Sequence, residues 1–409
     1  MATVDGIGAL GMLLALAVLG GFVASRLRMP ALLGMLLAGV AVRNVPGDLL
    51  EALPDSWSLV LRLLALTVIL LRAGLGMDLD ALVALRASLV RLAFLPNLSE
   101  AFTVAIAAKL VLDLPLLWGL LLGFVVAAVS PAVVVPSLLD LQQRGYGIVK
   151  GIPTMVLAAA TFDDVVSITG FGATLSLVFA DSGEATVIES LVRAPLELGL
   201  GLVTGVLAGL LCWTVARAPA WVRFGALSAL GLVAVLGGWA MGFAGGGSLA
   251  AMTMGAVSAR RWRGATVAVA KGMSWVWAVA QPILFGLIGA AVVLSAVEPS
   301  YINGGLVILV IGLAVRLVVT YLSASANHFN TRERLFVALA WIPKATVQAA
   351  IGALALDLAR RNEAGPQAEI YGTQIVTIAV LAILVTAPIG ALAIAWSGPR
   401  WLHRQRDST

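Results

Sequence analysis

Two adjacent aspartates, Asp163 and Asp164, stand inside an otherwise apolar stretch of the chain. A charge at the centre of a bilayer costs at least about 2.5 to 3.5 kcal/mol on insertion scales, so a carboxylate kept there needs a partner or a task. Neighbouring carboxylates resist being ionised at the same time, and a carboxylate must release its proton before it takes a hard cation. These residues at this spacing therefore favour a site where a cation and a proton exclude each other.

The geometry of a helix separates the two aspartates. Adjacent residues point about 100° apart, so Asp163 and Asp164 cannot both face one partner unless the helix is distorted. We expect one of them to hold a structural ion and the other to face a cavity. Arg62, Arg72 and Arg193 lie nearer the ends of apolar segments, where long side chains can snorkel to water. Four other ionisable residues are expected deeper in the membrane, each with a packing salt bridge as the plainer reading: Glu100, Lys109, Arg316 and Lys344.

Prolines interrupt two of the apolar stretches. The run VSPAVVVPSLL holds Pro131 and Pro136, and the run WIPKATVQAAIG holds Pro343 next to Lys344. Proline in the middle of a membrane helix removes an N–H and frees the carbonyl one turn earlier, which is tolerated where the backbone lines a cavity or binds an ion. Each proline alone reads equally well as an ordinary kink. Broken helices at matching positions, however, are the best sequence pointer to a transporter site.

Composition places these residues in a membrane. The 409 residues are 61% apolar and 11% charged, whereas a soluble domain carries about 25% charged residues. The net charge of +5 comes from short basic clusters between apolar runs, so it indicates membrane topology and not a nucleic-acid partner. A single cysteine, Cys212, and two histidines, His328 and His403, predict neither a disulfide framework nor a metal centre.

Apolar runs long enough to cross about 30 Å of hydrocarbon recur along the chain. We predict about thirteen spans, at residues 5–25, 30–44, 57–77, 88–112, 115–139, 150–180, 188–215, 222–242, 246–260, 269–296, 302–325, 333–358 and 370–397. Arginine and lysine gather in alternate connections, which places the N-terminus outside and the C-terminus in the cytoplasm. Six spans, a linker and six more spans predict two inverted repeats. The expected fold class is an all-α polytopic membrane protein with crossing broken helices.

Longer motifs give the chain a family resemblance. The run SPAVVVPSLLDLQQRGYGIVKGIPT is followed by TFDDVVSITGFG, with LLRAGLGMD upstream and AWIPKATVQAAIG downstream. Together they resemble the cation/proton antiporter superfamily, and in particular its NHA branch, the sodium/hydrogen exchangers of the 9B type. The resemblance covers about residues 29–358. It implies the sodium/proton antiporter fold, a homodimer, and a core domain that moves relative to a dimerisation domain.

The resemblance also implies roles for the charged residues. Asp164 matches the ion-binding aspartate, and Asp163 matches a neighbour that pairs with the lysine matched by Lys344. Glu100 and Arg316 match a buried ion pair. Whether Lys344 or Arg316 is the main partner of Asp163 stays open at this point. Exchanging the charges of Glu100 and Arg316 should therefore recover folding better than either single substitution, because removing one partner leaves the other uncompensated.

Oxygen ligands for a cation are implied at two further places. One is the broken-helix backbone around Val129 and Ser130, and the other is the turn at Ala160 and Thr161 before the aspartates. Where the wider superfamily has Asn-Asp, this chain has Asp-Asp. The resemblance also implies that the metal site is one for the transported Na⁺, at Asp163 and Asp164.

These observations predict a secondary active antiporter that exchanges Na⁺ or Li⁺ for H⁺ by alternating access. We expect no enzymatic activity and no cofactor beyond the transported ions. Within a membrane domain of residues 1–398, an elevator-like core part (about 88–180 and 302–397) should move against a dimerisation part (about 1–80 and 222–296), with a linker helix at 188–215 and a short tail at 399–409. A homodimer surrounded by membrane lipids, in the plasma membrane of a bacterium, is the expected setting.

Other functions fit the residues less well. A sodium-coupled symporter of an organic anion on the same fold is the main alternative, and it would need a polar substrate cavity. An intramembrane aspartyl protease needs two acids on facing helices, which adjacent aspartates do not supply. A cation channel needs a selectivity-filter loop or an acidic ring, and the sequence contains neither pattern.

Overall fold

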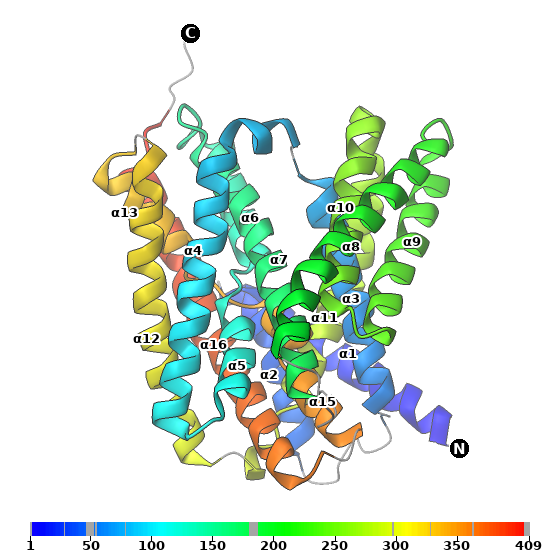
Figure 1. Cartoon of the computed structure of the whole chain (residues 1–409), viewed down its shortest axis with the longest axis vertical. Coiled ribbons are helices and arrows are strands. Elements are labelled where there is room, and N and C mark those ends of the chain that lie inside the picture. The colour runs from blue at the N-terminus through cyan, green and yellow to red at the C-terminus, as the bar shows by residue number, and fades with distance from the viewer. Residues whose placement is uncertain are drawn as a thin grey trace.

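The computed structural model describes residues 2–27, 29–45, 53, 55–77, 79–179, 187–296, 298–327, 329–361 and 364–404. Helices run side by side across a single layer (Figure 1). In chain order they are α1 (Ala2–Arg26), α2 (Ala31–Asn44), α3 (Asp55–Leu75), α4 (Leu79–Leu112), α5 (Leu116–Ala127), α6 (Pro131–Gln143), α7 (Ile152–Val178), α8 (Val187–Thr214), α9 (Ala220–Ala240), α10 (Ala244–Trp262), α11 (Thr266–Ala290), α12 (Pro299–Ser323), α13 (Thr331–Ala340), α14 (Thr346–Ile351), α15 (Leu354–Arg361) and α16 (Pro366–Trp401). Three short 3-10 turns, η1 (Arg263–Ala265), η2 (Leu294–Ala296) and η3 (Ala324–Asn327), lie between helices.

Each span predicted from the sequence has a helical counterpart in the structure. Within the described ranges, nine helical segments are long and apolar enough to span a bilayer, and two shorter apolar helices, Ala31–Asn44 and Gly199–Thr214, accompany them. The other two predicted spans, 246–260 and 333–358, correspond to α10 and to the interrupted segment from α13 to α15 (Figure 1). Predicted and observed ends agree within a few residues except at two helices: α11 ends at Ala290 and not near residue 296, and α4 begins at Leu79 and not near residue 88. No helix breaker separates residues 79 and 88, so the helix continues beyond the apolar run.

Two of the crossings are broken, and the sequence explains where. The break between α5 and α6 covers residues 128–130, because a residue before proline is pushed towards extended backbone: Ser130 has φ −93° and ψ 110°. Pro131 then occupies the first turn of α6, where its missing N–H costs nothing. Pro136, by contrast, lies within α6, whose helix continues past it. The second break, between α13 and α14, contains Pro343.

The two broken crossings run in opposite directions. The two ends of α16 mark the two faces of the layer. Near its C-terminal end, the Gly147 N–H in the α6–α7 connection donates to the carbonyl of His403 at 2.9 Å. Near its N-terminal end, Arg360 Nε of α15 lies 3.5 Å from Glu369 Oε2. The segments α5–α6 and α13–α15 therefore end at opposite faces, as the predicted inverted repeats require.

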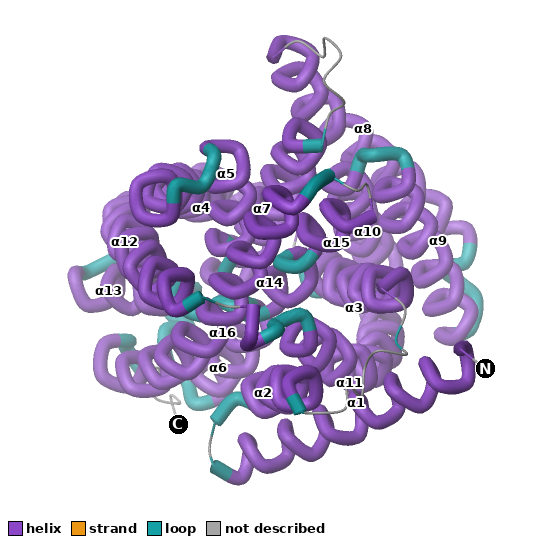
Figure 2. Tube along the Cα trace, turned by 90° about the horizontal axis from the view of Figure 1, so that it is seen from below, coloured by secondary structure: helices purple, strands orange, loops and turns teal. Residues whose placement is uncertain are grey.

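The breaks meet in the interior of the bundle. The Ser130 N–H donates to the carbonyl of Pro343 at 2.7 Å, which joins one unwound segment to the other. Gly390 of α16 lies against the Pro343 ring, and a Cβ added at Gly390 would come within 2.6 Å of Pro343 Cδ. Seen along the layer normal, α14 lies near the centre, with α4, α5, α12 and α13 to one side and α1, α3, α9 and α11 to the other (Figure 2).

Arg62 and Lys109 lie elsewhere than predicted, whereas Arg72 lies in the last turn of its helix, as expected. The side chain of Arg193 lies outside the described residues. Arg62 does not snorkel: it is 1% exposed and forms an ion pair with Asp357 of α15, because α15 covers this face of α3. Arg72 is half-buried, with its guanidinium 5.9 Å from the centre of the Trp277 ring. Lys109 lies at the exposed end of α4, 2.5 Å from the carboxylate of Asp113, and this hydrogen bond and charge hold the pKa of Asp113 below its usual range.

Candidate ion-binding site

Asp163 and Asp164 lie near the middle of α7, and both are buried. The helix is continuous from Ile152 to Val178, so it contains no distortion that would let both carboxylates face one partner. Asp163 shares its face with Ser167, one turn further along. Asp164 shares the next face with Ile168 and Phe171, at spacings of four and seven residues. The predicted separation of the two aspartates is therefore present in the fold.

The carboxylate of Asp163 is fully engaged. Arg316 of α12 donates through Nη2 to Oδ1 at 2.8 Å and to Oδ2 at 2.9 Å. The N–H of Val129, in the break between α5 and α6, donates to Oδ2 at 2.8 Å. Arg316, and not Lys344, is thus the direct partner of Asp163, which settles the alternative left open by the sequence.

Arg316 and Lys344 are joined through Glu100 of α4. Arg316 Nη1 donates to Glu100 Oε2 at 2.7 Å, and Lys344 Nζ donates to the same oxygen at 2.8 Å. Arg316 Nη1 also donates to the carbonyl of Ala127 at the C-terminal end of α5, where a cation opposes the negative end of the helix dipole. Glu100 and Arg316 therefore do form a buried ion pair, but as part of a larger network. The two acids, Asp163 and Glu100, and the two bases, Arg316 and Lys344, carry no net formal charge.

Asp164 stands outside this neutral network. It is 4% exposed, and its Oδ1 has no hydrogen-bond partner among the described residues. A cavity of about 10 Å³, enough for about one water molecule, lies on the Asp164 face of α7, and Ile168 and Phe171 line it together with Leu63, Ser248 and Ile351. When ionised, Asp164 therefore adds one negative charge to a group of side chains whose charges already cancel.

The freed backbone carbonyls of α5 already have donors. Gln348 of α14 donates through Nε2 to the carbonyls of Val125 at 2.7 Å and Ala128 at 2.9 Å. Arg316 takes the carbonyl of Ala127 between them. The break is thereby satisfied from the opposite repeat, in the way that buried backbone groups require. Sequence reasoning missed Gln348, although it lies in the same WIPKATVQAAIG run that drew attention to Lys344.

The predicted oxygen ligands are placed as follows. Val129 contributes its N–H to Asp163, and the Ser130 hydroxyl lies 3.4 Å from the Thr346 hydroxyl. Ala160 is buried within α7, which remains helical through Ala160 and Thr161, so the expected turn there is absent. The side chains of Thr161 and Pro136 lie outside the described residues.

Sequence reasoning also missed Asn97 of α4. It is fully buried, and its Nδ2 donates to the main-chain carbonyl of Asp163 at 3.0 Å and to the Ser167 hydroxyl at 2.7 Å. A signal was available, because Asn97 directly follows Pro96 in an apolar span, and a polar residue beside a helix-breaking residue stands out there.

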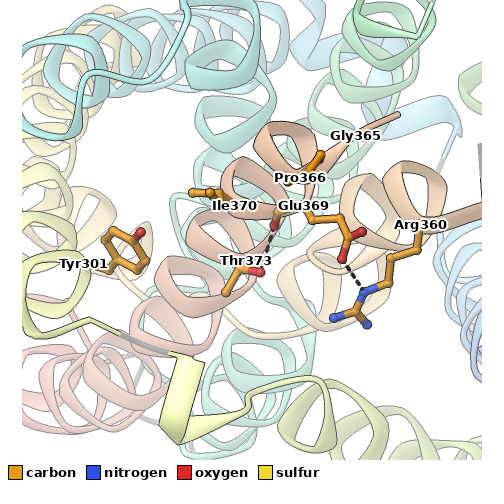
Figure 3. A pocket seen from close by; sticks show the side chains of 7 residues that line it. All are labelled: Tyr301, Arg360, Gly365, Pro366, Glu369, Ile370 and Thr373. Carbon is orange, nitrogen blue, oxygen red and sulfur yellow. Dashed lines mark hydrogen bonds and ion pairs between the residues drawn. The ribbon is translucent and has the colours of Figure 1, made fainter. Parts of the chain in front are cut away.

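A larger pocket lies away from these residues. It has a volume of about 560 Å³ and lies at the surface between α12, α15 and α16 (Figure 3). Tyr301, Arg360, Glu369 and Thr373 line it, together with Gly365, Pro366 and Ile370. None of the predicted site residues is among them. Across the described part of the chain, no cluster of three or more His, Cys, Asp or Glu side chains could hold a metal ion.

The family assignment follows from comparison with known proteins. The family model described as "Sodium/hydrogen exchanger, transmembrane" matches residues 13–397. The chain belongs to the sodium/hydrogen exchanger family. This exchanger is 41% identical over 405 residues to "Sodium/hydrogen exchanger 9B2" of Xenopus tropicalis, an alignment that covers 96% of this chain and 74% of that protein. It is 40% identical over 399 residues to "Sodium/hydrogen exchanger 9B1" of Homo sapiens, covering 96% and 77%. The predicted resemblance to the 9B type is confirmed.

A solved structure confirms the fold of this exchanger. The sodium proton antiporter MjNhaP1 of Methanocaldococcus jannaschii superposes with a TM-score of 0.80 and 21% sequence identity, covering 98% of this chain and 99% of that one. The predicted membrane antiporter fold is therefore correct. The 9B relatives named above come from a frog and a human, so they give no support to the expected bacterial source.

Proposed function

We propose that this protein exchanges a monovalent cation, Na⁺ or Li⁺, for a proton across the membrane by alternating access. One observation carries the proposal. Asp164 is a buried carboxylate whose Oδ1 has no hydrogen-bond partner among the described residues, and it adjoins a network whose charges already cancel. One cation or one proton neutralises Asp164, and the two cannot bind it together. The names of the 9B relatives and of the archaeal neighbour agree with this chemistry.

The carboxylate of Asp164 couples the movement of the cation to that of the proton. Deprotonated Asp164 takes a partly dehydrated cation from one side, and the neutral site then crosses the low-dielectric barrier. On the other side a proton displaces the cation, and the protonated site returns. A bare carboxylate crosses at a much higher free energy than a neutral one, so return without a ligand is suppressed. Oxygens of Val129 and Ser130, in the break between α5 and α6, complete the cation's shell in this proposal.

Asp163 and the basic residues have a different role in the proposal. Asp163 stays bound to Arg316, and Lys344 stays close to Glu100, so four charges move as a neutral unit. The broken helices at Pro131 and Pro343 bring these groups to one depth. The protein acts as a carrier, and we assign it no enzymatic activity and no cofactor.

The moving part is proposed to comprise about residues 88–180 and 302–397. All four members of the charge network lie in these ranges, as do both aspartates and both breaks. They would move as one body against about residues 1–80 and 222–296, which would form a homodimer, with the helix at 188–215 as linker. The basic connections would face the cytoplasm, with the N-terminus outside, in the plasma membrane.

Reconstitution in proteoliposomes tests the proposal. An inward sodium gradient should drive proton efflux, and Asp164→Asn should abolish it, because an amide can neither bind a proton nor compensate a cation. Asp140→Asn is the matched control, since Asp140 pairs with Arg144 at an exposed helix end. Exchange that survives Asp164→Asn would refute the site. Sodium uptake without proton movement would point to a symporter, which no observation favours: the cavity that Ile168 and Phe171 of α7 line measures about 10 Å³.

A further inference from the structure

We propose that Asn97 is a positioning residue of the exchange site, which fixes the rotation of α7 so that Asp163 stays on Arg316 and Asp164 is left for the ion. The inference rests on the proposed function. It concerns a residue that contacts neither the guanidinium nor the ammonium group of the network. Its contacts are with the backbone of α7 at the aspartates themselves.

The orientation of the Asn97 amide is determined by its acceptors. The main-chain carbonyl of Asp163 can only accept, so the nitrogen of the amide must face it. The Ser167 hydroxyl, one helical turn along, receives the second N–H. The two contacts hold successive turns on the same face of α7, which fixes both the rotation and the height of the helix.

This arrangement leaves the Asn97 oxygen buried without a hydrogen-bond partner among the described residues. An unpaired buried acceptor is unfavourable, and an apolar residue of similar volume would avoid that loss. Stability alone therefore does not account for an amide here. The N–H donors of Asn97 explain why an amide occupies this position, because a leucine side chain cannot donate a hydrogen bond to the carbonyl of Asp163.

The position of Asn97 on α4 links the aspartates to the charge network. Pro96 precedes Asn97 inside α4 and has no N–H to donate to the carbonyl of Leu92, so α4 lacks one backbone hydrogen bond at this turn. Glu100, three residues further on the same face, accepts from both Arg316 and Lys344. One short stretch of α4 therefore holds α7 with one side chain and the bases with another.

Rotation of α7 would exchange the roles of the aspartates. The face of Asp163 and Ser167 meets α4, while the face of Asp164, Ile168 and Phe171 borders the small cavity. Adjacent residues differ by about 100°. Rotation of α7 about its axis by part of that angle would move Asp163 away from Arg316 and bring Asp164 closer to it. The two hydrogen bonds from Asn97 oppose this rotation. Loss of these bonds should weaken cation binding more than it slows turnover.

Asn97→Leu is the principal test, in the same proteoliposome assay. We expect the apparent KM for Na⁺ and Li⁺ to rise about tenfold, with the maximal rate within about twofold of the unaltered protein; misplacement of a bound group by about 1 Å has effects of this size or larger. Asn97→Asp should restore the KM where its carboxyl is protonated, because it then donates one hydrogen bond. Ser167→Ala should give a smaller rise, and adding it to Asn97→Leu should give no further rise.

Asn44→Leu is the matched control. Asn44 of α2 also donates through Nδ2 to main-chain carbonyls, those of Val40 and Val292, both at 2.8 Å. Its loss should lower thermal stability without changing the KM. Sodium-induced thermal stabilisation in detergent is a second readout, and it should shrink in Asn97→Leu and persist in Asn44→Leu.

The outcomes separate this proposal from the function on which it rests. A KM within twofold of the unaltered protein in Asn97→Leu overturns the role of Asn97. If Asn97→Leu does not fold, unchanged KM values in both Ser167→Ala and Asn97→Asp at a pH above neutrality overturn it. Should the unaltered protein show no sodium-driven proton movement, the proposed function itself fails. Exchange that is present in the unaltered protein and lost in Asp164→Asn leaves only Asn97 in question.

Discussion

Arg316 grips Asp163 through both oxygens of its carboxylate, with Nη2 at 2.8 Å from Oδ1 and 2.9 Å from Oδ2. The other terminal nitrogen of the same guanidinium serves Glu100 and the carbonyl of Ala127. One side chain of α12 thus ties α7, α4 and the end of α5 together. This relationship gives both oxygens of Asp163 a hydrogen-bond donor in the interior, while Oδ1 of the adjacent Asp164 has none among the described residues.

Substitution of Arg316 should be severely destabilising. Arg316→Ala leaves Asp163 and the end of α5 uncompensated, so we expect a loss of about 3 to 5 kcal/mol in the free energy of unfolding. Arg144→Ala, which breaks an exposed pair with Asp140, should cost less than about 1 kcal/mol. Chemical unfolding in detergent measures both. Equal losses in the two variants would contradict the network.

Exchange of the Glu100 and Arg316 charges should not rescue folding. An isolated pair would tolerate Glu100→Arg with Arg316→Glu, as the sequence suggested. In the structure the first change faces Lys344 and the second faces Asp163, so like charges meet at both places. The double variant should be no more stable than Arg316→Glu alone. Recovery of the native unfolding midpoint would mean that these neighbouring contacts are wrong.

The exchange should show competition between protons and sodium. Because one carboxylate takes either ligand, lowering the pH raises the apparent KM for Na⁺, by up to about tenfold per pH unit where a single proton competes. The maximal rate at saturating Na⁺ should stay constant over the same range. Initial rates in proteoliposomes at several pH values provide the measurement. A falling maximal rate with a constant KM would indicate a separate proton site.

Transport should move no net charge. The network of two acids and two bases is neutral, and Asp164 alone changes its ligand, so one cation exchanges for one proton. Sodium-driven proton flux should then have the same rate with the membrane potential clamped at zero or at a large negative value. A rate that follows the imposed potential would show that a second charge titrates during the cycle.

The Arg62–Asp357 pair should couple α3 to α15. Arg62 is 1% exposed, so Arg62→Leu should cost about 3 kcal/mol or more by leaving Asp357 without this partner. The double variant with Asp357→Leu should lose less than the sum of the two single losses. A double-mutant cycle on unfolding free energies tests this. Strict additivity would show that the two side chains do not interact.

Gly390 should tolerate no side chain. A Cβ there would come within 2.8 Å of the Pro343 nitrogen, and a proline ring in an unwound segment cannot turn aside. Gly390→Ala should therefore displace residues 341–345 and lower both exchange and thermal stability. Gly237→Ala in α9 is the matched control, because nothing lies within 4 Å of its Cβ position. Its stability should be unchanged or slightly higher, since alanine favours a helix.

Much of the fold could be predicted without coordinates. Bilayer thickness sets the length of each span, and the alternation of basic connections sets its direction, so the crossings follow from composition along the chain. Pro131 and Pro343 marked the two breaks because proline disfavours helical backbone at the residue before it. The continuous α7 could not be inferred in the same way, since nothing in the run before Asp163 distinguishes a turn from a helix.

The sequence by itself determined that this is a membrane exchanger fold with two buried aspartates among a few opposed charges, because burying a charge in hydrocarbon is too costly to occur by chance. Only the tertiary structure decided which charge meets which. Arg316 lies 153 positions from Asp163, and Lys344 lies 244 positions from Glu100. Their pairing depends on how the two broken crossings pass each other, and angles of a few tens of degrees between helices leave no trace in local sequence.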